Sequence, residues 1–190
     1  MRLIARPLLA VLCALSCGWA PAAQPAGVPA GDINACELLT SAQIATAIGV
    51  NVDDGRRQDL GRQADGSYAS ACIWMIRGES PAARRGRRFV ILSAMQWPAG
   101  RNMADRYLQS FRDSAAKGVI ASQPSPRKYG DEALWWGDGL AVRKDDISFG
   151  ISVFLPDAPS NQPRRTSVLE EKLAPLILRS IERRAAHEAV

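Results

Sequence analysis

Residues 89–97 read FVILSAMQW, and their apolar side chains occupy both odd and even positions. Because successive side chains of a strand point to opposite faces of a sheet, a strand of this kind is typically buried on both sides. The segment therefore predicts a central strand that other elements cover on both faces.

A second β signal runs through residues 130–154, where apolar side chains alternate with small or polar ones. The alternating apolar positions of its last part are Ile147, Phe149, Ile151 and Val153. Turn-forming residues at 137–139 and 144–146 separate the apolar runs. The stretch predicts a three-stranded antiparallel meander.

Three segments have apolar side chains at helical spacing, and they are residues 40–49, 102–118 and 166–184. Thr40 and Gln43 fit a capping box at the start of the first helix. Asn102 is the expected cap of the second helix. Pro175 lies inside the third helix, where it is expected to cause a kink or a restart.

Another strand is expected at residues 69–77 and a short extended piece at 119–122. The polar residues 51–67 read as a loop that holds a poor strand at most. The sequence thus predicts the α+β class, with a mainly antiparallel sheet of five or six strands flanked by three helices in the order αββα(β)βββα.

The N-terminus is typical of a secretory signal. Arg2 and Arg6 flank the start of a short apolar run, and residues 20–22 (APA) fit a small-x-small cleavage site. We expect a signal peptide over residues 1–22, an unstructured leader over 23–32, one domain over 33–186 and a tail over 187–190. The protein is therefore expected to be exported, to the periplasm or outside the cell.

Residues 14–17 (ALSC) leave an alternative open. They are similar to a bacterial lipobox, in which Cys17 would be lipidated and would anchor the chain to a membrane. Ala14 departs from that pattern, since Leu is favoured at its position. Soluble export is the preferred interpretation, and contact with a membrane is expected only if Cys17 is lipidated.

Cys36 and Cys72 are the two cysteines that remain after removal of the signal. Two cysteines in an oxidising compartment most often pair, and the chain has no CxxC redox motif. A bridge between them closes a loop of about 37 residues, for which the chain-entropy model gives a stabilisation of about 4 kcal/mol. The sequence predicts a structural disulfide.

The formal net charge is +5, and it falls to +3 without Arg2 and Arg6. This is an ordinary value for a protein of this length. A nucleic-acid site needs many basic side chains gathered on one face, and an exported protein rarely meets nucleic acid. No nucleic-acid partner is predicted.

Most catalytic constellations are missing. His187 is the only histidine and lies close to the C-terminus, which argues against a His-dependent triad and a multi-histidine zinc site. The sequence has no nucleophile elbow, Walker loop, dinucleotide fingerprint or EF-hand loop. We therefore predict no catalytic residue, no metal and no cofactor.

Adjacent carboxylates are the remaining candidates for acid–base chemistry. Neighbours on a strand point to opposite faces, so adjacency alone does not make a catalytic pair. Asp131 and Glu132 are the best candidates because they precede an aromatic strand. A carboxylate-dependent hydrolase that acts on an envelope polymer is kept as an alternative.

Two features are candidates for binding. Four arginines crowd into a connection between predicted strands, namely Arg84, Arg85, Arg87 and Arg88. They could dock an anionic partner or keep a hairpin tip soluble. Trp135 and Trp136 must face opposite sides of their strand, so one of them could line a site.

The segment CELLTSAQI (36–44), the Cys72-x-Trp74 strand and the 130–154 meander together resemble a loose class of bacterial envelope proteins. These small exported or lipid-anchored domains are similar to the extracellular sensor domains of some actinobacterial kinases. The resemblance implies a helix-flanked antiparallel sheet with a cleft, and it carries over no catalytic residue. The weak lipobox and the arginine-rich insert depart from the pattern.

We therefore expect a non-catalytic binding or accessory module of the envelope. Its expected binding surface is the concave side of the sheet together with the arginine-rich connection, and its partner is an envelope protein or an anionic ligand. A third alternative is an inhibitor or a subunit of a secretion or cell-wall complex.

Overall fold

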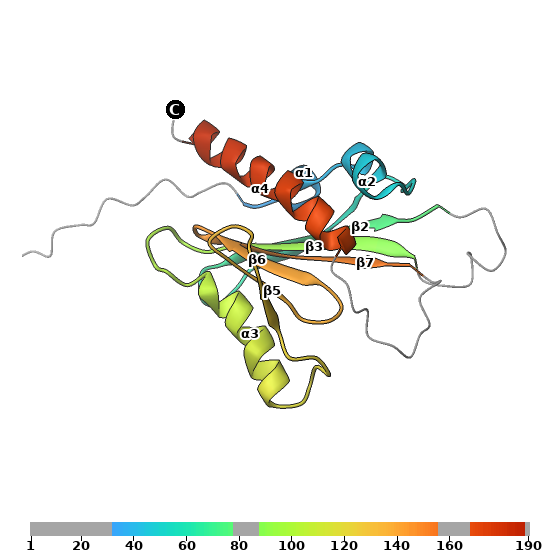
Figure 1. Cartoon of the computed structure of the whole chain (residues 1–190). Helices are drawn as coiled ribbons and strands as arrows, with labels where there is room; N and C mark the ends of the chain where they lie inside the picture. The colour runs from blue at the N-terminus through green and yellow to red at the C-terminus, as the bar shows by residue number, and fades with distance from the viewer. Residues whose placement is uncertain (1–31, 78–87, 156–167, 189–190) are drawn as a thin grey trace, which may run out of the picture.

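The structure is a computed structural model, and it describes residues 32–77, 88–155 and 168–188 (Figure 1). Its helices are α1 (Ala35–Leu38), α2 (Ser41–Ile48), α3 (Asp105–Ala116) and α4 (Val168–Glu188). Its strands are β1 (Arg56–Arg62), β2 (Tyr68–Met75), β3 (Phe89–Gln96), β4 (Ser125–Arg127), β5 (Glu132–Trp135), β6 (Leu140–Lys144) and β7 (Ile147–Phe154). The predicted α+β class is confirmed, although the described residues hold seven strands and four helices, more than expected.

Several sequence predictions concern residues outside the described ranges. They are the signal peptide, the leader up to residue 31, Cys17, Arg84, Arg85, Arg87 and residues 189–190 of the tail.

The strands form one antiparallel sheet in the order β1-β2-β3-β7-β6-β5-β4. Strands β5, β6 and β7 are the predicted meander. Strand β7 then pairs along its whole length with β3, from Phe154 opposite Phe89 to Ile147 opposite Gln96. With β2 on its other side, β3 lies inside the sheet, as its sequence predicts.

Neither edge strand is predicted clearly from the sequence. β1 is polar and almost wholly exposed, so it has no alternating signal. β4 has three residues, includes Pro126, and comes after the extended piece expected at 119–122, which is not a strand. A strand that pairs on one side only needs few apolar side chains and tolerates proline.

One face of the sheet lies beneath α1, α2 and α4 (Figure 1). Their apolar side chains and those of the central strands form the main core. Among its fully buried members are Trp74, Leu92, Phe149, Leu173 and Ile177. Each such side chain contributes roughly 1.5–3 kcal/mol through burial, so this layer is the chief source of stability.

Helix α2 begins and ends as predicted. The side chain of Thr40 accepts a hydrogen bond from the N–H of Gln43, and the Gln43 side chain accepts one from the N–H of Thr40 at 2.8 Å. Gly49 follows the helix with φ of 73°, a left-handed conformation that glycine adopts without strain. The capping box is therefore confirmed.

Helix α3 is the one described helix on the opposite face, where it contacts β6 and β7 (Figure 1). Leu108, Leu134 and Ala141 form a second, smaller core beneath it. The Tyr107 hydroxyl packs so closely on Gly150 that a Cβ there would overlap it.

The cap predicted for α3 is wrong. Ala104 occupies the cap position and makes no side-chain hydrogen bond to the helix. Asn102 lies two residues earlier, in a loop, with φ of 48°. Its left-handed backbone takes it out of the extended conformation that a capping residue normally has.

Helix α4 is continuous through Pro175, so the helix does not restart there, and the predicted alternative of a kink stays a prediction. Glu170 is fully buried near its start, and its Oε1 accepts a hydrogen bond from the N–H of Val153 at 2.8 Å. Val153 lies beyond the last β6–β7 pair, so the carboxylate takes the place of a β6 partner at this end of β7. His187, expected in the tail, is exposed in the last turn of the helix.

None of the helices in the described ranges is long and apolar enough to cross a membrane.

The predicted disulfide between Cys36 and Cys72 is confirmed. It joins α1 to β2 across a sequence separation of 36, with Cα atoms 5.1 Å apart. Cys72 is fully buried, and a Cβ at Gly55 would come within 2.6 Å of its sulfur. The bridge therefore fastens the helical layer to the sheet at a tightly packed point.

We expect the double substitution Cys36→Ala and Cys72→Ala to lower the free energy of unfolding by about 4 kcal/mol, because the unfolded chain gains conformational freedom. Urea unfolding followed by tryptophan fluorescence measures this change. A loss below about 1 kcal/mol would contradict a stabilising role for the bridge.

Candidate functional site

Among the described elements, only α3 packs on the opposite face of the sheet, where it lies over β6 and β7 (Figure 1). Beyond α3, two cross-strand pairs lie on this face, Ile73 with Ile91 and Met75 with Phe89. Met75 is 40% exposed and the other three are half-buried. We call these four residues of β2 and β3 the open half-face.

The open half-face results from strand alternation. The intervening residues of β2 and β3 point to the opposite, helix-covered side, and Cys72, Trp74, Val90 and Leu92 are at most 1% exposed there. The sequence predicts that residues 89–97 are covered on both faces. This is confirmed for one face; on the other, the described helix α3 packs on β6 and β7, and Phe89 and Ile91 are half-buried.

Both edges of the sheet are poorly suited to pairing with another strand. β1 carries three arginines and one aspartate, and its register shifts between Asp59 and Gly61. β4 is short and has Pro126 at its centre. Charges, bulges and proline are the usual protection of sheet edges. A partner is therefore better accommodated by a face than by an edge.

Arginines border the open half-face. Arg56 on β1 pairs in register with Ile73 and is exposed. Arg77 follows the end of β2, and its Nε donates to a carboxylate oxygen of Asp53 at 2.6 Å. Arg88, the described member of the predicted arginine cluster, is half-buried directly before Phe89.

Trp135 and Trp136 lie on opposite sides of the sheet, as alternation requires. Trp135 is 6% exposed and belongs to the main core. Trp136 is half-buried and stacks on Phe111 of α3, with ring centroids 4.4 Å apart. A binding role for either residue stays a prediction, with Trp136 the more accessible of the two.

Asp131 and Glu132 are both engaged in ion pairs. Glu132 pairs with Arg112, and its second oxygen lies 3.9 Å from the Nε of Arg143. Asp131 lies 3.4 Å from both Arg143 and Lys144, and it accepts a hydrogen bond from the N–H of Asp145 at 2.6 Å. These contacts brace the β6–β7 turn, whose Asp145 has a left-handed φ of 52°.

A surface hollow of about 470 Å³ lies beside this turn, and Asp105, Asp131, Asp145 and Asp146 are among its lining residues. Burial alone would raise the pKa of Asp131. The N–H of Asp145 and the charge of Lys144 outweigh burial and hold that pKa below its usual value. An ionised Asp131 is unsuited to act as a general acid at neutral pH.

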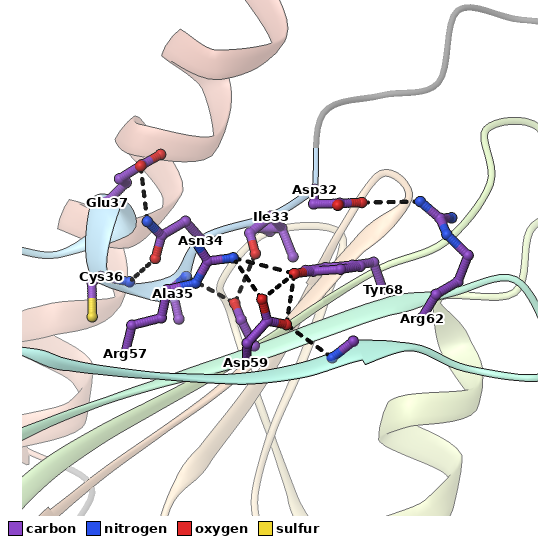
Figure 2. A network of polar contacts seen from close by, with 12 residues as sticks. Asp32, Ile33, Asn34, Ala35, Cys36, Glu37, Arg57, Asp59, Arg62 and Tyr68 are labelled. Carbon is purple, nitrogen blue, oxygen red and sulfur yellow. Dashed lines mark hydrogen bonds and ion pairs between the residues drawn. The ribbon is translucent and has the colours of Figure 1, made fainter.

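A separate polar network anchors the N-terminal end of the domain (Figure 2). The Tyr68 hydroxyl donates to Asp59 at 2.6 Å, and Arg57 bonds both residues. Ser70, the register partner of Asp59, donates to the carbonyl of Ile33 at 2.8 Å. The network holds the chain where it enters the fold.

The hydrogen bond from Tyr68 lowers the pKa of Asp59 and raises the pKa of Tyr68. Asp59 is therefore charged and Tyr68 protonated at neutral pH. The Asp59 carboxylate already accepts hydrogen bonds from the Tyr68 hydroxyl and from the N–H of Gly61, and the first of these contacts links β1 to β2.

An apolar hollow of about 420 Å³ lies between α2 and α4, and its lining includes Ala42, Ala47, Leu176 and the charged Lys172. Within residues 32–77, 88–155 and 168–188, no group of three or more His, Cys, Asp or Glu side chains is arranged to hold a metal ion.

Comparison of the chain with protein-family models, with curated proteins and with solved structures finds no match. The resemblance to bacterial envelope proteins therefore stays a prediction.

The contacts of Asp131 predict a pH effect. Its pKa is lowered from 3.8 in the folded state, so its stabilisation is present above the unfolded pKa and is lost as pH falls through the folded value. We expect Asp131→Asn to lower the urea midpoint at pH 6 and to cost much less at pH 3. Asp54→Asn, which alters an exposed carboxylate, is the control, and an equal cost of Asp131→Asn at both pH values would refute the prediction.

Proposed function

We propose that this chain is an exported, non-catalytic binding module of the bacterial envelope that recognises an anionic component. The signal-like N-terminus supports export, and the Cys36–Cys72 disulfide is in keeping with an oxidising compartment. The proposed binding surface is the open half-face and the basic residues around it.

The distribution of charge supports an anionic ligand. The described residues hold 17 Lys and Arg and 17 Asp and Glu. Residues 78–87 and 156–167 hold five arginines and two acidic residues, which accounts for the whole net charge of +3 that remains after residue 22. The five are Arg84, Arg85, Arg87, Arg164 and Arg165.

Both of these segments join the described structure at the same end of the sheet. The first connects β2 to β3, and the second follows β7. The register sets Met75, Phe89 and Phe154 side by side at that end. The excess of positive charge therefore belongs to two segments that attach to the sheet at the end where Met75 and Phe89 lie, and this observation carries the proposal, because gathered cations attract anionic ligands.

Binding is better supported than the hydrolase alternative. The two carboxylates that such an enzyme would use, Asp131 and Glu132, are held by Arg143, Lys144 and Arg112. Asp131 stabilises the β6–β7 turn, and Glu132 links β5 to α3 through Arg112. No contact in the described ranges favours the inhibitor alternative.

Replacement of Arg84, Arg85, Arg87 and Arg88 by Gln tests the proposal. Each basic residue near an anionic surface contributes on the order of 1 kcal/mol, so we expect affinity for anionic probes to fall about tenfold or more. The probes are inorganic polyphosphate and phosphatidylglycerol vesicles, measured by calorimetry and by cosedimentation.

The matched control replaces four exposed basic residues elsewhere, Arg101, Arg106, Lys117 and Arg179, by Gln. It removes the same charge, so its affinity is expected to stay within about twofold of the unsubstituted protein if position matters. Equal losses in the two variants would show that net charge alone is responsible and would contradict the proposed site.

A further inference from the structure

We infer that the open half-face binds the hydrocarbon chain of an anionic lipid, whose head group lies at the arginine margin. This inference rests on the proposed function and names the class of its ligand.

The open half-face presents hydrocarbon without hydrogen-bonding groups. Ile73, Met75, Phe89 and Ile91 form a block of two cross-strand pairs. Strands β2 and β3 each pair on both sides, so their backbone donors and acceptors are already used in the sheet. A polyphosphate, which has no apolar surface, would leave these side chains exposed to water, whereas an acyl chain would cover them.

Cations lie at the margin of this apolar block. Arg56 is the register neighbour of Ile73, and it forms no ion pair with a carboxylate of the described residues. Arg77 lies two residues after Met75, the last residue of β2. Its ion pair with Asp53 is exposed to solvent. An apolar surface with arginines at its border matches a molecule with an apolar chain and an anionic head.

A second copy of the chain fits the same surface less well. Face-to-face packing through the open half-face would bring the Arg56 side chains of two copies to one interface, and like charges there oppose association. A partner that supplies the opposite charge avoids this cost.

The test compares two matched pairs of substitutions in the full chain. Met75→Gln with Ile91→Thr changes the open half-face and keeps the charge. Leu60→Gln with Val119→Thr changes two other exposed apolar side chains, which are 50% and 75% exposed. Met75→Gln alone, at an exposed position, serves if the pair lowers the thermal midpoint. The probes are phosphatidylglycerol vesicles, phosphatidylcholine vesicles and inorganic polyphosphate.

We expect the Met75/Ile91 variant to bind phosphatidylglycerol vesicles about tenfold more weakly and polyphosphate within about twofold of the unsubstituted protein. The Leu60/Val119 variant should match the unsubstituted protein on every probe. Phosphatidylcholine vesicles should bind weakly throughout, since they offer no net negative charge.

Three outcomes would overturn the inference. Unchanged vesicle binding by the Met75/Ile91 variant would leave a purely charge-based site and preserve the proposed function. A dimer that this variant dissociates would assign the face to a second copy. No binding of the unsubstituted protein to either anionic probe would overturn the proposed function as well.

Discussion

The packing of α1, α2 and α4 on one face of the sheet holds the molecule together. Trp74, Leu92 and Phe149 are buried there, and the Cys36–Cys72 bridge fastens the helical layer to β2. Glu170 adds a buried contact between α4 and the end of β7. Three of the four described helices lie on this face, and α3 alone of them packs on the opposite face.

The position of α3 determines which apolar side chains on its face of the sheet it covers. Small residues beneath it let it approach closely, since Gly150 receives the Tyr107 hydroxyl and a Cβ at Gly139 would overlap Trp136. The helix is thereby fixed over β6 and β7. The apolar side chains that β2 and β3 present on the same face are then only half-buried, although their alternation resembles that of a covered sheet. The two arginine-containing segments, 78–87 and 156–167, attach to the sheet at the end where Met75, Phe89 and Phe154 lie.

Much of the fold could be predicted because it depends on local patterns. Residues close together in the sequence determine the capping box at Thr40 and the alternation along β7. The disulfide could be predicted because each of the two remaining cysteines has only one possible partner. The edge strands could not be predicted in the same way. β1 is stabilised by its pairing with β2 and not by apolar side chains of its own, and the three residues of β4 are too few for a periodic signal.

Only part of the candidate site could be predicted from the sequence. Strand alternation predicts that Trp135 and Trp136 face opposite sides, but not which side is filled. The apolar residues of β3 predict cover on both faces, whereas the cover of each face depends on where α3 lies, which is a tertiary property. Asp131 and Glu132 attract attention as adjacent acids, and only their distances to Arg143, Lys144 and Arg112 identify them as supports.

Accessibility of the methyl groups on the two faces of β2 and β3 tests the central claim most directly. Methyl NMR spectra recorded with a soluble paramagnetic probe would report it for each residue. Strong broadening is predicted for the methyl groups of Ile73, Met75 and Ile91, relieved when phosphatidylglycerol is added, and little for Leu92 and Ile151 on the helix-covered face. Equal protection of Ile73, Ile91 and Ile151 in the absence of lipid would contradict the account.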